Sequence, residues 1–394
     1  MGHIRTLLLA GAALVALAPV AIAAPSDWNI DPYTVELSDL NLTVGGEVYG
    51  TAFSANQPSA PGIQTTNVTG AATLTASVQR DYDSGLSLGV KSAFEIYHDK
   101  LSGDNYGSDL VQKVYGVAQT GLGRVELGMT DGAAYALSVT GPVVDGEMTL
   151  DNSNASLFTD PSTGRDFTNL FALNSAVESS LNYSKISYYT PRLLGIEIGA
   201  SFTPSQGKDV IPFLSNGPHV ANREKSIWET AVSYSDSFGP YSLGFYGGLS
   251  VGRNDTKTAG HASLTDWGVG SQIDYDLNDD VKLSLGGAYR HANTYGFDIG
   301  EALLHSQTNS AHLSAMASFG PWLIGGEIGD GTAEGTPKLG VRGYEASVGY
   351  VINANFQVTA GWQELRYSRD AGIFYNGASR IRMDGAYLHL KLHV

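Results

Sequence analysis

The chain has 394 residues, no cysteine, 16% charged residues and a formal net charge of −16. The absence of cysteine excludes a disulfide framework and a thiolate metal site, and the acidity argues against a nucleic-acid partner, which needs clustered Lys and Arg. The composition also departs from that of ordinary soluble domains, in which about 25% of residues are charged, because glycine (48 residues) and tyrosine (21 residues) are abundant here.

Residues 1–23 have the composition of an export signal. Arg5 is followed by an apolar run and then by small residues, which is the order found in secretory signals. The apolar run is shorter than the roughly 20 residues that a membrane-spanning helix needs, which disfavours an uncleaved anchor. We therefore expect cleavage before Ala24, a short extended lead-in over residues 24–40 on the periplasmic side, and a single domain over residues 41–394.

From residue 41 onward, apolar and polar side chains alternate in short segments. In residues 85–99, for example, Leu88 and Val90 share one parity, whereas Ser87 and Lys91 share the other. This alternation predicts strands with one apolar and one polar face. Sixteen such segments occur, at residues 41–53, 70–82, 85–99, 110–120, 123–130, 181–190, 193–203, 226–236, 241–252, 263–277, 281–292, 307–319, 321–330, 340–351, 355–368 and 380–394.

The links between these segments alternate between short and long. Each even-numbered segment is followed by a tight turn, such as Gly121-Leu122, and each odd-numbered segment by a longer link. Short turns at one end and long loops at the other are typical of outer-membrane barrels. Together with the export signal and with Tyr and Trp near the segment ends, this asymmetry predicts an all-β fold, a transmembrane antiparallel up-and-down β-barrel of about 16 strands.

The longest link, residues 131–180, contains no alternating segment. Links above about 12 to 15 residues are unusual in compact domains unless they are functional or disordered. This link is rich in apolar residues such as Leu137, Val144, Leu157 and Phe171, which disfavours a solvated tether. We therefore expect an ordered loop that packs inside a wide lumen.

Three short motifs flank this link. They are GRVELG at 123–128, KISYYTP at 185–191 and ASFTP at 200–204. These motifs resemble the Gram-negative general (non-specific) porins, in the variety found in alphaproteobacteria, and the resemblance covers essentially the whole mature chain. The family usually ends in Phe, whereas this chain ends in Val394.

The resemblance implies a homotrimer of sixteen-stranded barrels in the outer membrane. In each barrel the third external loop, here residues 131–180, would fold into the lumen as a constriction. The expected function is passive diffusion of small hydrophilic solutes and ions, with outer-membrane lipid and lipopolysaccharide as surroundings and no nucleic acid as partner.

Other functions remain open at this point: a substrate-specific channel, an outer-membrane barrel enzyme, or an adhesin. No fixed-spacing catalytic motif supports an enzyme, so we expect none. No cofactor is indicated either. Acidic loops offer oxygen ligands to surface calcium, but nothing in the sequence fixes a ligand set.

Strand parity places four basic side chains on the inner face of the expected barrel, and the long link contributes acids. The basic residues are Lys91, Arg124, Lys185 and Arg290. The acids are Asp145, Glu147, Asp151, Asp160 and Asp166, with Glu178 near the end of the link. We expect the first three basic residues to face these acids across the constriction. The overall acidity predicts mild cation selectivity, although the geometry of the constriction decides it.

Overall fold

The computed structural model describes the chain in segments separated by gaps. The described residues are 33–37, 39–57, 65–98, 111–151, 157–158, 173–205, 224–254, 263–293, 307–334, 338–369 and 379–394. The expected export signal and the loop acids Asp160 and Asp166 lie outside these residues.

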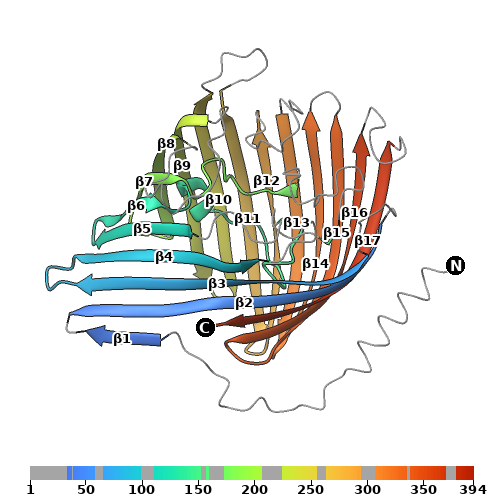
Figure 1. The fold of residues 1–394 in the computed structure, drawn as a ribbon, viewed down its shortest axis with the longest axis horizontal. Helices are drawn as coiled ribbons and strands as arrows, with labels where there is room; N and C mark the ends of the chain where they lie inside the picture. The colour runs from blue at the N-terminus through green and yellow to red at the C-terminus, as the bar shows by residue number, and fades with distance from the viewer. Residues whose placement is uncertain are drawn as a thin grey trace.

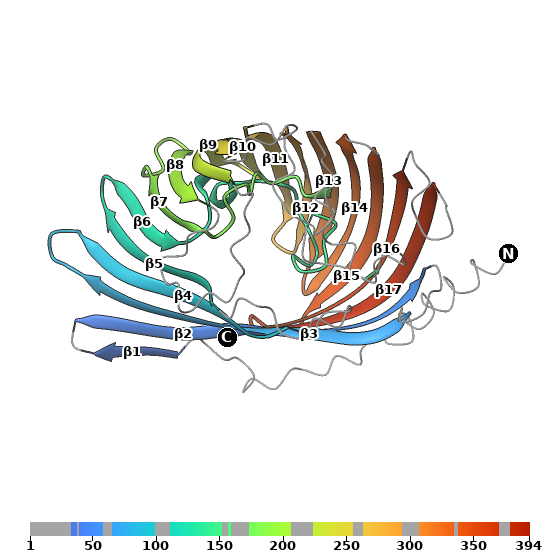
Figure 2. The same cartoon turned by 45° about the horizontal axis from the view of Figure 1, so that its top comes forward.

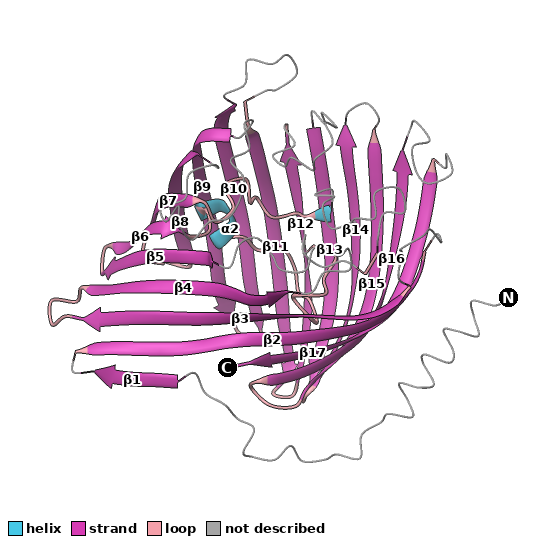
Figure 3. Cartoon of the chain, in the orientation of Figure 1, coloured by secondary structure: helices cyan, strands magenta, loops and turns pink. Residues whose placement is uncertain are grey.

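The described residues form one large sheet of seventeen strands and one helical turn (Figure 3). The turn is α2 (Ala133–Ala136), in the link between β6 and β7. The strands are β1 (Tyr33–Leu37), β2 (Leu40–Asn56), β3 (Thr66–Asp81), β4 (Ser87–His98), β5 (Val111–Thr120), β6 (Gly123–Met129), β7 (Ser184–Tyr189), β8 (Ile196–Ser205), β9 (Glu224–Phe238), β10 (Tyr241–Asn254), β11 (Thr265–Asn278), β12 (Val281–Ala292), β13 (Gln307–Phe319), β14 (Trp322–Glu334), β15 (Leu339–Val351), β16 (Phe356–Arg369) and β17 (Arg380–His393).

Sixteen of these strands close into an antiparallel barrel. Each strand from β2 to β17 pairs with its neighbour in chain order, and β17 pairs back onto β2 (Figure 1). At this seam His393 lies opposite Glu47, and the backbone N–H and C=O of Val394 both bond to Gly46. The predicted barrel is thus confirmed.

The remaining strand, β1, lies within the segment expected to be a lead-in. It pairs with the first residues of β2, with Tyr33 opposite Val44 and Leu37 opposite Leu40. It therefore pairs with the same edge of β2 as β17 does, next to the C-terminal residue Val394. Its sequence, YTVEL, alternates between apolar and polar residues, so the segment does contain the pattern of a short strand.

Short turns and longer links alternate as predicted. Gly239 and Gly320, in the turns after β9 and β13, have φ values of 60° and 53°, a left-handed conformation that suits glycine. One link is shorter than expected, since β14 continues to Glu334 and β15 begins at Leu339. The extra residues of β14 are mostly small, so they give no apolar alternation.

The two faces of the wall have opposite character. Outward residues such as Val90 and Leu313 are each 53% exposed, whereas the inward residues Ser310, His312 and Ser314 are buried. An exposed apolar outer face and a polar inner face are the arrangement of a membrane barrel. Among the described residues, no helix has the length and apolarity needed to cross a membrane.

Candidate channel constriction

The described part of the long link lies against the inner wall of the barrel. In Figure 2 its segments, drawn green, lie inside the ring of strands. α2 contacts β7, β8, β9 and β10. Further along, Val139 lies beside Gly270 and Val144 lies between Gly325 and Gly349. We call residues 132–144 the first arm; it runs along the wall from β7 to β15.

Inward-facing glycines make room for this arm. An added Cβ would overlap the carbonyl oxygen of Val139 at Gly270, and it would lie 2.7 Å from Val144 Cγ2 at Gly325. Glycine permits this close approach because it has no side chain. We call these glycines the glycine track; they are Gly244 (β10), Gly270 (β11), Gly286 (β12), Gly325 (β14) and Gly349 (β15).

The link then turns over residues 145–151, and polar groups of the wall hold this turn. Gln357 donates to Val144 O (2.8 Å) and Gln363 donates to Met148 O. The carboxylate of Glu327 accepts bonds from Thr149 Oγ1 (2.6 Å) and from the backbone N–H of Leu150 (3.0 Å).

The same turn reaches β17. Asp145 Oδ2 lies 3.7 Å from His389 Nε2, and Glu147 lies 3.8 Å from the Lys391 ammonium. In the ring of sixteen strands β17 is eight places from β9. The turn therefore docks on the wall opposite α2.

The return arm, residues 173–181, is held mainly by carboxylates. Ser179 donates to Asp266, whose two oxygens also accept bonds from Arg290 Nε (2.9 Å) and Nη2 (2.8 Å). The backbone N–H of Ser180 donates to Glu229 (3.1 Å). The first arm and the return arm thus contact different groups of the inner wall.

Comparison with known proteins identifies the family. The profile of the Gram-negative porin family matches residues 10–370. The chain belongs to the Gram-negative porin family. It is therefore an outer-membrane diffusion channel and not an enzyme. No curated protein sequence matches the porin.

Solved structures with the same fold share little sequence with this porin. OmpT of Vibrio cholerae, in a loop-deletion mutant, has 11% identity and a TM-score of 0.56 over 91% of this chain and 100% of that chain. An anion-selective porin from Comamonas acidovorans has 15% identity and a TM-score of 0.55 over 90% and 100%. A mutant of the Rh. blastica porin has 13% identity and a TM-score of 0.51 over the same fractions.

Lys185 does not line the lumen of the porin as expected. It is 2% exposed, and its ammonium donates to the carbonyl oxygens of Thr130, Ser180 and Leu181. The prediction was wrong because the two ends of the loop cross over the start of β7 and cover this side chain. The Lys185 ammonium instead bonds to the backbone at both ends of the loop.

The other three predicted basic residues have different environments. Arg290 is 8% exposed and pairs with Asp266 beside the return arm. Arg124 pairs with Glu126 (3.0 Å) and stacks over the ring of Tyr189. Lys91 is exposed on the inner face of β4, opposite Tyr115.

The described loop acids also have partners other than the expected ones. Asp145 is buried against His389, and Glu147 lies near Lys391. Asp151 accepts bonds from both the N–H (2.6 Å) and the hydroxyl (2.7 Å) of Ser175. Strand parity shows which way a side chain points, but it does not show how far around the ring a loop travels.

Two half-exposed ion pairs of the lumen were missed. Lys113 pairs with Asp131 (2.6 Å), and Lys391 pairs with Glu47 (2.9 Å). Both lysines lie at inward parity on predicted strands, so the alternation contained this signal. Among the described residues, no group of three or more His, Asp or Glu is placed to hold a metal ion.

Burial and nearby charges change the pKa values of two loop residues, Glu178 and Tyr135. Burial raises the pKa of Glu178 to about 7, although the charge of Arg290 and the hydrogen bond from Asn174 (2.7 Å) act in the opposite direction. Partial desolvation in the crowded lumen raises the pKa of Tyr135 to about 12, and nearby negative charges add to this effect. These charges are Glu178, Asp131, Asp151 and Glu147.

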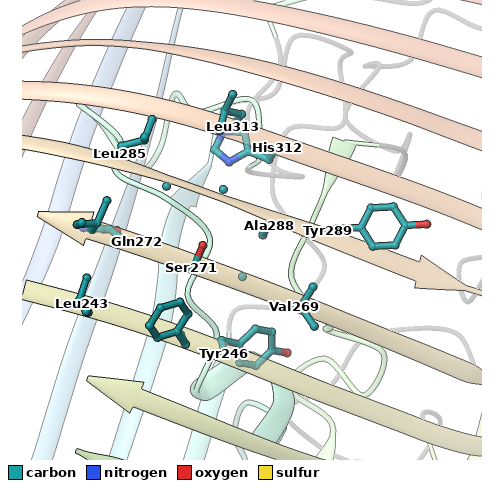
Figure 4. A pocket seen from close by; sticks show the side chains of 15 residues that line it. Leu243, Tyr246, Val269, Ser271, Gln272, Leu285, Ala288, Tyr289, His312 and Leu313 are labelled. Atoms are coloured by element: carbon teal, nitrogen blue, oxygen red, sulfur yellow. The ribbon is translucent and has the colours of Figure 1, made fainter. Parts of the chain in front are cut away.

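One pocket lies outside the lumen. It has a volume of about 790 Å³ and lies on β10–β13 (Figure 4). Most of its lining side chains have outward parity, including Phe245, Val269, Leu285 and Leu313, and the small residue Gly287 leaves the depression between them. The pocket is therefore a hollow in the apolar outer wall and not part of the solute path.

Proposed function

We propose that this porin is a general channel for small hydrophilic solutes and ions, mildly cation-selective, and that residues 131–180 form its constriction. The docking of the loop along the inner wall supports this proposal, because a segment that lines the lumen narrows the path. Diffusion then depends on the width and the field at that level.

The proposed preference for cations rests on the negative charges near Tyr135. Carboxylates from the start of the loop (Asp131), its turn (Glu147, Asp151) and its return arm (Glu178) all act on this one hydroxyl. Two of the predicted basic residues, Lys185 and Arg290, are buried in other contacts. Lys113 pairs with Asp131 and Lys391 lies near Glu147, so these two lysines offset the four carboxylates only in part. The remaining negative field attracts cations.

Charge-neutralising variants test this proposal in planar bilayers. Glu147→Gln and Asp151→Asn should each move the reversal potential in a KCl gradient toward zero selectivity. Asp276→Asn, at an exposed pair with Lys282 near a short turn, is the matched control and should leave it unchanged. An unchanged reversal potential in both loop variants would contradict the proposed constriction.

We also propose a homotrimer that assembles through the outer faces of β2 to β6. In β2, β3, β5 and β6 the aromatic residues are Tyr49, Phe53 and Tyr115, and they have inward parity, whereas β4 between them carries the exposed Tyr97. Elsewhere the outer face carries exposed aromatics such as Trp228 and Phe245, as lipid-facing girdles do.

A solved OmpT structure described in a trimer form supports this assembly. Membrane insertion of the purified porin should then give three equal conductance steps. Insertions that give only single steps would argue for a monomer.

A further inference from the structure

The helical turn α2 directs one large side chain away from the wall. Ala133 and Ala134 are 0% exposed, and the N–H of Ala133 donates to Ser201 Oγ (3.0 Å). Leu137 is buried in an apolar cluster with Tyr189. Because successive helical residues are rotated by roughly 100°, burial of these positions turns residue 135 toward the lumen.

Tyr135 is exposed accordingly. It is 42% exposed, unlike its buried neighbours in the turn. The turn packs closely on the wall, since any side chain at position 132 would overlap the carboxylate of Glu229. Tyr135 therefore projects from a closely packed turn.

The exposed side chain of Tyr135 lies near carboxylates of the loop. It projects from a turn that contacts β7–β10, and the charges of Glu178, Asp131, Asp151 and Glu147 act on its hydroxyl. A solute that passes this side chain therefore meets an aromatic ring and negative charge together.

We infer that Tyr135 is the specificity-determining residue of the channel: its ring limits solute size and contacts organic ammonium ions as they pass. The inference rests on the proposed cation-selective channel and adds a named contact to it. An aromatic face attracts cations within about 6 Å. The surrounding carboxylates raise the local concentration of cations and disfavour anions of the same size.

Size and cation contact are separable by substitution. Tyr135→Phe keeps the ring and should retain current block by tetramethylammonium. Tyr135→Leu removes the aromatic face but keeps an apolar side chain, whereas Tyr135→Ala removes most of the volume. Tyr241→Ala, at an exposed tyrosine of the outer face, is the control.

The probes are tetramethylammonium and tetraethylammonium chloride in single-channel recordings. Tyr135→Leu should weaken current block by tetramethylammonium roughly 2- to 30-fold, the range of a cation–π contact. Tyr135→Ala should raise KCl conductance and admit tetraethylammonium at a higher rate. Block that is equal in the Leu and Phe variants, together with unchanged conductance in the Ala variant, would overturn the inference.

Failure of the underlying channel proposal would look different. It would appear as absent or anion-selective KCl conductance in the unmodified protein. A purely structural role for Tyr135 would lower the unfolding temperature of the variants while leaving selectivity and block unchanged, which also counts against the inference.

Discussion

The two arms of the long loop are fixed to the same wall by different physical means. The first arm fits into the glycine track, where Gly270 and Gly325 leave space for Val139 and Val144. The return arm depends on charged groups of the wall, chiefly Asp266 with Arg290 and Glu229 with Ser180. The return arm also packs on glycines, with Leu173 beside Gly329 and Val177 beside Gly268. Shape thus positions both arms, and hydrogen bonds to buried carboxylates add a second anchor to the return arm.

This difference predicts different responses to substitution. A side chain added to the track displaces backbone, with a cost set by how far the arm can shift. Removal of a buried carboxylate leaves its partners desolvated and unpaired, which costs more. Substitutions in the glycine track and in the buried carboxylates therefore test the anchoring of the two arms independently.

The largest effect is expected for Asp266→Ala. Loss of this carboxylate leaves the largely buried Arg290 guanidinium and the Ser179 hydroxyl without their partner, at a cost of about 3 kcal/mol. Thermal unfolding in detergent micelles should show the loss, and the return arm should become sensitive to protease. Asp276→Ala on the same strand removes an exposed pair with Lys282 and should change stability by less than about 1 kcal/mol. Equal effects would contradict charge-based anchoring of the return arm.

Gly270→Ala tests the first arm. The new methyl group would collide with the carbonyl oxygen of Val139, so we expect a loss of about 2 kcal/mol and an altered single-channel conductance. The control is Gly247→Ala, where the added Cβ would meet only Val232 Cγ1, at 3.9 Å. If both variants conduct like the parent protein, the track does not position the arm.

Thr149→Val tests the turn between the arms. It removes the hydroxyl that donates to Glu327 but retains the backbone bond from Leu150 to the same carboxylate. The expected loss is about 1 kcal/mol, visible as more open-channel noise. Thr66→Val, at an exposed position, should leave the noise at the parent level.

The smallest effect concerns pH and Glu178. Its pKa of about 7 lies above the ordinary value of 4.5, so folding favours the protonated form. The contribution to loop stability is full below about pH 4.5 and is lost as pH rises through about 7. Burial causes the rise in this pKa, the negative charges of Asp151 from the loop and Asp266 from the wall add to it, and the charge of Arg290 and the hydrogen bond from Asn174 oppose it.

Cation preference should therefore increase modestly between pH 5 and pH 8 as Glu178 ionises. Reversal potentials at the two values measure this change. Glu178→Gln should remove most of the step, and a step of equal size in the variant would assign the titration to another group.

The barrel could be predicted from the sequence because strand alternation and link length are local signals. Lys91 in the 85–99 segment already indicated an inward face, and the segment at 123–130 corresponds to β6 (Gly123–Met129). Strand β1 was missed although its five residues alternate, because so short a segment is a weak signal.

The site was only partly predictable. Inward parity for Lys185 and Arg290 was a local inference, but their burial results from the loop that covers them. The glycine track offered a usable signal: glycines at inward positions of strands that otherwise alternate. Such glycines indicate close approach of backbone, although they do not identify which segment approaches.

We propose that carboxylates of the folded-in loop give the open pore a field that attracts cations. The reversal potential of the purified, refolded porin across a planar bilayer in a KCl gradient tests this most directly. We predict a stable conductance with a potential that favours potassium. A potential that favours chloride, or no conductance, would contradict this proposal.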